Sequence, residues 1–145
     1  MPTQKESIRN LLKVLKDWQL IEDNAVWNTS KIIKKTKNPL IKIIMEIIRQ
    51  DSAMHKRVQQ LILDNFEKGR ISLDLSDLNA FWELVEEHDK IERKTIELAE
   101  KAIDETTSPL VRYLLKYLLV DEKKHNQLLE EIDKVKKGLY PYGKV

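Results

Sequence analysis

The most informative stretch of the sequence for the fold is Asp121-Glu122-Lys123-Lys124-His125. Residues three apart on a helix project from nearly the same face, so Glu122 and His125 can both reach one metal ion. Carboxylate and imidazole groups are both common ligands of divalent transition metals. The same short pattern is also typical of an exposed, charged helical turn, so it carries weight only together with other features of the chain.

An internal repeat supplies such a feature. The stretch Asp51-Ser52-Ala53-Met54-His55 lies 70 positions earlier, which places Asp51 on Asp121 and His55 on His125 without a gap. Two of the four prolines and two of the three histidines are matched by this one offset. The third histidine, His88, lies one helical turn before a glutamate of the repeat. The same register also aligns Ile21-Glu22 with Ile91-Glu92, Thr36 with Thr106, Asn38-Pro39-Leu40 with Ser108-Pro109-Leu110, and Ile62 with Ile132.

Composition limits the class of protein. A chain of 145 residues suits one domain with a substantial core. Its 26 basic and 24 acidic residues give a net charge of +2, which offers no electrostatic case for nucleic acid or an anionic membrane as partner. Cysteine is absent, which excludes disulfides, thiolate metal sites and a cysteine nucleophile. The first ten residues lack the apolar core of a signal peptide, and we expect a cytoplasmic protein without a membrane span.

Apolar residues recur with a period of about 3.6 through four segments, which predicts four helices, the first from about Gln4 to Lys35. The Asn38-Pro39 and Ser108-Pro109 pairs separate helices within each half, because proline suits the first turn of a helix. We expect Ser76 or Asp77 to cap the third helix. The predicted organisation is a single domain, 1–145, with one hairpin at about 4–68, a crossover at 69–76, a second hairpin at about 77–137 and a tail at 138–145.

The repeat predicts how the hairpins connect. Two equivalent hairpins pack most simply about a pseudo-twofold axis, which requires a connection as long as the bundle. The end of the second helix and the start of the third together measure roughly 36 Å along their axes, and the connection must span this length. About 11 extended residues are long enough to do so. Residues 70–76 alternate apolar and polar side chains, which indicates extended chain. A simple up-down-up-down bundle would need only a short loop there. The sequence thus predicts an all-α four-helix bundle of two repeated hairpins joined by an extended crossover.

This arrangement resembles the ferritin-like di-iron carboxylate superfamily, nearest its rubrerythrin branch, over residues 4–137. The family carries a glutamate on the first and third helices and Glu-x-x-His on the second and fourth. The resemblance implies that these matching residues are metal ligands: Glu22, His55, Glu92, Glu122 and His125. Other interpretations stay open at this point, since Glu22 can lie at a solvated edge and the two histidines can be core residues without metal.

The resemblance also implies supporting residues and one departure. Asp51 and Asp121 resemble aspartates that accept a hydrogen bond from the histidine of the opposite hairpin. Ser52 stands where the family has the second helix's glutamate, so one ligand is missing. His88 or Asp89 can compensate, and we prefer His88. Trp18 occupies the position equivalent to His88 in the first half, so the two metal positions are expected to be unequal.

The expected cofactors are two metal ions, iron most of all, with manganese as the alternative. The resemblance implies an oxidoreductase of peroxidase or ferroxidase type that reacts with peroxide or dioxygen. Electrons would come from a separate donor protein, because the cysteine-bearing module of a complete rubrerythrin is missing, and a homodimer is expected. The alternative is a decayed single-metal or metal-free bundle that serves as a binding or structural protein.

Overall fold

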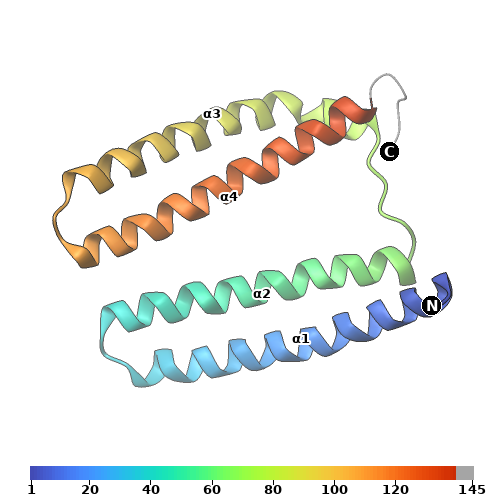
Figure 1. Ribbon diagram of the computed structural model, residues 1–145, viewed down its shortest axis with the longest axis horizontal. Helices are drawn as coiled ribbons and strands as arrows, with labels where there is room; N and C mark the ends of the chain where they lie inside the picture. The colour runs from blue at the N-terminus through green and yellow to red at the C-terminus, as the bar shows by residue number, and fades with distance from the viewer. Residues whose placement is uncertain (140–145) are drawn as a thin grey trace. The chain divides into compact units, whose positions relative to one another are not determined.

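The computed structural model describes residues 1–139, apart from the side chains of Leu75 and Leu139 (Figure 1). The described chain is all-α, as predicted from the periodicity of its apolar residues. None of the described helices combines the length and apolar character needed to cross a membrane. The four helices are α1 (Gln4–Lys35), α2 (Pro39–Glu67), α3 (Leu75–Glu105) and α4 (Pro109–Leu139).

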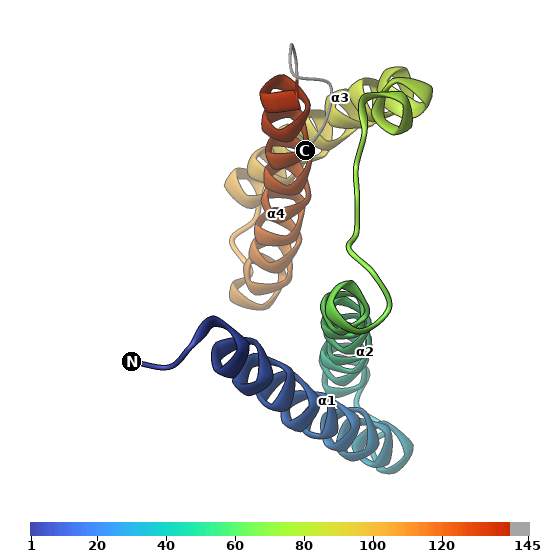
Figure 2. The same cartoon turned by 90° about the vertical axis from the view of Figure 1, so that its right-hand side faces the viewer.

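The helices form two hairpins, each a compact unit. One unit spans residues 1–71 and the other begins at Ser72. In the first, α1 packs along α2, and in the second, α3 packs along α4. Figures 1 and 2 show that the two helices of each pair run antiparallel. Two hairpins of this kind are the elements predicted for an all-α four-helix bundle.

The turns inside the two hairpins are built alike. Thr36 ends α1 in extended conformation, and its Oγ1 accepts a hydrogen bond of 3.1 Å from the Asn38 amide. Thr106 ends α3 in the same way and accepts a bond of 3.2 Å from the Ser108 amide. Asn38 and Ser108 then accept from amides in the first turn of the next helix, which satisfies donors that have no partner inside the helix. The local sequence therefore determines the turn in each helical hairpin.

The connection between the hairpins leaves α2 at Gly69, whose φ is +136°. A side chain would be strained at this backbone angle, so glycine suits the exit. Figure 2 shows the following segment as extended chain. It ends earlier than predicted, because Asp74 caps α3 in place of Ser76 or Asp77. The Asp74 carboxylate accepts from the Asp77 amide, and the Asp77 side chain accepts from the Asp74 amide, so this capping box places Ser76 in the first turn.

The prediction that the tail starts at residue 138 was wrong. Helix α4 continues through Gly138 to Leu139. Two contacts hold its last turns: the Lys136 ammonium lies 3.8 Å from the centre of the Trp82 ring on α3, and Lys137 pairs with Asp133 at 2.7 Å. They offset the helix-weakening effect of glycine. The rest of the predicted tail, 140–145, lies outside the described residues.

The interior of each hairpin mixes apolar and polar side chains. Leu15 and Leu63 are buried in the first hairpin, and Leu78 is buried in the second. Polar side chains share this buried position, which is costly unless each finds a hydrogen-bond partner or an ion. They are Glu22, Thr29, Ser52, Gln59 and Glu92. The glutamates aligned by the repeat, Glu22 and Glu92, thus lie inside the hairpins, whereas the His55 side chain is 57 % exposed and that of His125 is 41 % exposed.

Candidate metal centre

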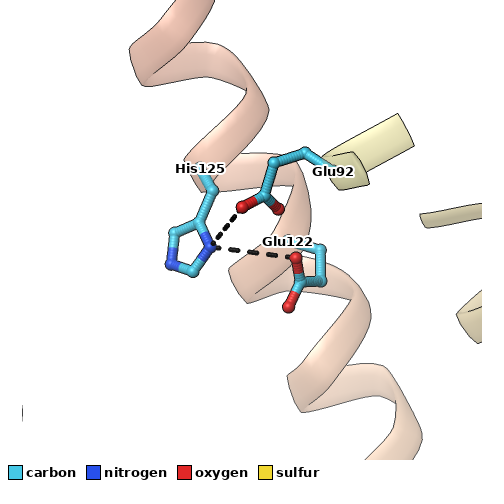
Figure 3. Close-up of side chains that lie close together, drawn as sticks. All are labelled: Glu92, Glu122 and His125. Atoms are coloured by element: carbon cyan, nitrogen blue, oxygen red, sulfur yellow. Dashed lines mark ion pairs between the residues drawn. The ribbon is translucent and has the colours of Figure 1, made fainter. Parts of the chain in front are cut away.

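Three side chains of the second hairpin converge on one point (Figure 3). Glu92 reaches it from α3, and Glu122 and His125 reach it from one face of α4, as their three-residue spacing predicts. One ligand atom from each residue lies within 4.8 Å of the other two. The His125 Nδ1 is 3.5 Å from Glu92 Oε1 and 3.8 Å from Glu122 Oε2. This donor set can hold a divalent ion.

Burial makes Glu92 the critical member of this cluster. The residue is 5 % exposed, and its Oε2 atom is buried without a hydrogen-bond donor among the described residues. Carboxylate oxygens are normally paired when they leave water, because desolvation of a charge is strongly unfavourable. A buried oxygen beside a second carboxylate and an imidazole is what a cation site requires, so the residues present fit a metal.

The carboxyl groups of Glu92 and Glu122 shift each other's pKa in opposite directions. The hydrogen bond between Glu92 and Glu122 lowers the pKa of Glu92 and raises the pKa of Glu122. Burial raises the pKa of Glu122 further, because it disfavours a second negative charge beside the first. A proton on Glu122 and a bound divalent cation are therefore alternative ways of reducing the repulsion between these two carboxylates.

Thr95 orients the cluster from α3. Its Oγ1 lies 2.9 Å from Glu122 Oε2 and 2.7 Å from the backbone carbonyl of Glu92. The hydroxyl carries a single hydrogen, so it donates to one of these oxygens at a time. Its position fixes the Glu122 carboxylate against α3. Thr95 was not predicted as a site residue, although its spacing of three from Glu92 places the two on one helical face.

His88 touches the cluster, whereas Asp89 does not. The His88 Nε2 lies 2.8 Å from Glu92 Oε1, across one helical turn. Asp89 instead pairs with Arg93 at 3.0 Å. Of the two residues that could compensate for the missing glutamate, His88 is therefore the one that lies at the cluster.

Asp121 lies beside the histidine of its own helix. Its Oδ2 is 3.4 Å from His125 Nε2, and its Oδ1 pairs with Lys124 at 2.8 Å. The His125 ring thus has a carboxylate near each of its nitrogens, since Nδ1 lies toward Glu92. A carboxylate on the outer nitrogen can fix which nitrogen carries the proton and can leave the other free to bind a metal.

The first hairpin brings together Glu22 and His55 but surrounds them differently. The His55 Nδ1 is 3.5 Å from Glu22 Oε1, the same separation as between His125 and Glu92. The indole Nε1 of Trp18 donates a 3.0 Å hydrogen bond to that same Glu22 oxygen. Ser52 is buried and supplies no carboxylate, while Asp51 is exposed. This pair has one fewer acid than its counterpart in the second hairpin.

The candidate residues therefore fall into two groups, one in each hairpin. The first hairpin holds a Glu–His pair, and the second holds a cluster of two glutamates and one histidine, with His88 in contact with Glu92. No protein family model, curated protein or solved structure matches the chain.

Proposed function

We propose that the chain is a metal-binding protein whose iron- or manganese-loaded form reduces peroxide or dioxygen with electrons from a separate donor. The observation that carries the proposal is the convergence of Glu92, Glu122 and His125, whose ligand atoms lie within 4.8 Å of one another, together with a buried Glu92 oxygen that has no donor among the described residues. The Glu22–His55 pair is the candidate position for a second metal ion. The ferritin-like resemblance drawn from the 70-residue repeat supports this assignment.

The donor types suit the proposed metals. Carboxylates and imidazoles together favour iron and manganese over calcium, which prefers oxygen ligands alone, and over soft metals, which prefer sulfur. When bound, such a metal supplies the capacity to pass an electron to an oxidant. The described part of the chain has no cysteine to relay that electron, so the donor in this proposal is a different protein.

The residues around the metal position have separate tasks. Glu122, whose pKa is raised beside Glu92, would lose its proton on binding a cation. Thr95 keeps the Glu122 carboxylate directed at the cluster through its 2.9 Å contact. Asp121 holds the outer nitrogen of His125. In each case a side chain of this protein either holds a proton or orients a metal ligand.

The first test is metal content joined to oxidant chemistry. Protein purified without added metal is analysed for bound metals, then loaded anaerobically with ferrous ion and mixed with hydrogen peroxide. We expect bound iron, rapid formation of ferric absorbance, and turnover when a small-molecule reductant is supplied. Glu122→Gln should lose most of this reaction, whereas Glu131→Gln, an exposed residue of the same helix, should keep it.

Two other outcomes assign a different function. Protein that binds iron but reacts no faster with peroxide than free ferrous ion would be a metal-binding protein without oxidase or peroxidase activity. Protein that binds neither iron nor manganese would be the metal-free bundle, which serves as a binding or structural protein. The hydrogen bond from Trp18 to Glu22 is the observation that favours this second candidate in the first hairpin, because it satisfies the carboxylate without an ion.

A further inference from the structure

We infer that the α3–α4 hairpin binds one divalent transition-metal ion by itself, through Glu92, Glu122 and His125, before the Glu22–His55 pair of α1–α2 binds any. This inference rests on the proposed metal-binding function. It adds an order of loading that the function alone does not require.

The short contact between His88 and Glu92 is the first ground. The imidazole Nε2 lies 2.8 Å from Glu92 Oε1, and that same oxygen is 3.5 Å from His125 Nδ1. A neutral imidazole with its proton on Nδ1 offers a lone pair at Nε2. Among the described residues, only Glu92, Glu122 and His125 bring three ligand atoms within 4.8 Å of one another, so His88 is a positioning residue that holds Glu92. These three side-chain ligands match the number of protein ligands that zinc takes in open protein sites.

The unsatisfied oxygen of Glu92 is the second ground, and it does not depend on His88. Glu92 is 5 % exposed, and its Oε2 has no hydrogen-bond donor among the described residues. Buried carboxylate oxygens of this kind are rare unless an ion or ordered water completes them. The two neighbouring histidines make a metal ion the fitting partner.

The first hairpin differs at the position equivalent to His88. The 70-residue offset places Trp18 there, and its indole N–H donates to Glu22 Oε1 at 3.0 Å. An indole nitrogen is a donor only and has no lone pair for a metal. The Glu22 carboxylate is therefore already satisfied on that side by a group that cannot bind a cation.

Two further replacements weaken the first hairpin in the same direction. Ser52 stands at the position of Glu122, and Ala25 stands at the position of Thr95, whose hydroxyl orients that glutamate. The first hairpin thus lacks the second carboxylate and the residue that would hold it. Fewer negative charges and fewer ligands both lower affinity for a divalent ion. The second hairpin must fill first.

The three histidines make this order directly measurable. Long-range ¹H–¹⁵N spectra of the full chain report the imidazole nitrogens of His55, His88 and His125 separately, because the chain has 3 histidines in all. Zinc ion is the probe, since it has no redox chemistry and no unpaired electrons to broaden distant signals. We expect the first equivalent to shift His88 and His125 together and to leave His55 in place.

Exchange of residues between the hairpins tests the cause. Trp18→His combined with Ser52→Glu gives the first hairpin the donors of the second, and zinc stoichiometry should rise from one toward two per chain. In the opposite direction, His88→Leu should weaken the first zinc by about tenfold or more. Glu87→Gln, the exposed neighbour of His88, should leave zinc affinity unchanged.

The failure of the inference and the failure of the proposed function give different spectra. If His55 shifts with His125 at the first equivalent, the inference is wrong while metal binding stands. If none of the three imidazoles responds to zinc, ferrous or manganous ion, the proposed function itself is wrong. The wild-type spectra distinguish these outcomes even if a substituted chain does not fold.

Discussion

Glu92 and Glu122 face each other from α3 and α4, and the hydrogen bond between their carboxyl groups lowers the pKa of Glu92 and raises the pKa of Glu122. The contribution of Glu122 to stability is present at low pH and is lost as pH rises through its raised pKa. The contribution of Glu92 is present above its unfolded pKa and is lost as pH falls through its lowered pKa. The metal-free pair therefore stabilises the hairpin most at pH values between the lowered pKa of Glu92 and the raised pKa of Glu122.

Metal binding should depend on pH through the same pair. A cation displaces the proton of Glu122, so affinity for manganous ion should rise with pH between the ordinary glutamate pKa and the raised pKa of Glu122. Calorimetric titrations in buffers of different ionisation enthalpy measure the protons released on binding. About one proton per ion is expected in this range. Equal affinity and no proton release across the range would contradict the displacement of that proton by the cation.

Chelation should lower the thermal stability of the protein. A ligand that binds only the native state at one hundred times its dissociation constant adds about 2.7 kcal/mol to the free energy of unfolding. For a chain of this size that corresponds to a rise in Tm of roughly 5 to 10 °C. Differential scanning calorimetry with manganous ion and with chelator measures it. The Glu92→Gln variant should show no such difference, and a metal-dependent rise retained in that variant would place the site elsewhere.

Thr95→Val should separate positioning from ligation. Valine keeps the shape of threonine but removes the hydroxyl that lies 2.9 Å from Glu122 Oε2. The freed carboxylate should bind manganous ion roughly tenfold more weakly, while one ion per chain is still bound. Thr95→Ser retains the hydroxyl and should restore the affinity. An affinity equal to wild type in the valine variant would show that Thr95 does not orient the ligand.

Gln59→Leu should stabilise the metal-free protein. Gln59 is 3 % exposed on α2, and neither its Nε2 nor its Oε1 has a hydrogen-bond partner among the described residues. The repeat has Leu129 at the equivalent position. Removing a buried amide without partners should raise the free energy of unfolding by about 1 to 2 kcal/mol, measured by urea denaturation. Gln50→Leu, on an exposed part of the same helix, is the control. A loss of stability in Gln59→Leu would show that the amide has a partner in solution.

Asp74→Ala should destabilise the start of α3. The carboxylate accepts from the Ser76 hydroxyl and the Asp77 amide, and these bonds lower the pKa of Asp74. Their stabilisation is present above the unfolded pKa of Asp74 and is lost as pH falls through the lowered one. Amide hydrogen exchange in the first turn of α3 should therefore speed up at neutral pH in the alanine variant. Asp74→Ser keeps a capping oxygen and should retain most of the protection.

Local sequence patterns determined the helices and the turns between them. Periodic apolar residues predicted all four helices, and α1 begins and ends at the predicted residues. The two turns follow from Thr36 with Asn38 and from Thr106 with Ser108, because each contact lies within three residues. The start of α3 was not determined in this way, since three neighbouring polar residues can each cap a helix. The capping box selected Asp74, and that choice depends on which carboxylate reaches which amide.

Spacing along one helix also identified the candidate ligands, since Glu122 and His125 share a face wherever the helix lies. Of their neighbours on α3, the repeat and the resemblance had already named Glu92 and His88, whereas Thr95 was missed. The contact of Thr95 with Glu122 and the approach of Glu92 to His125 join different helices, so they depend on the register in which α3 and α4 pack. Periodicity does not specify side-chain rotamers. In the tertiary structure, the rotamers place His88 against Glu92 and Asp89 against Arg93.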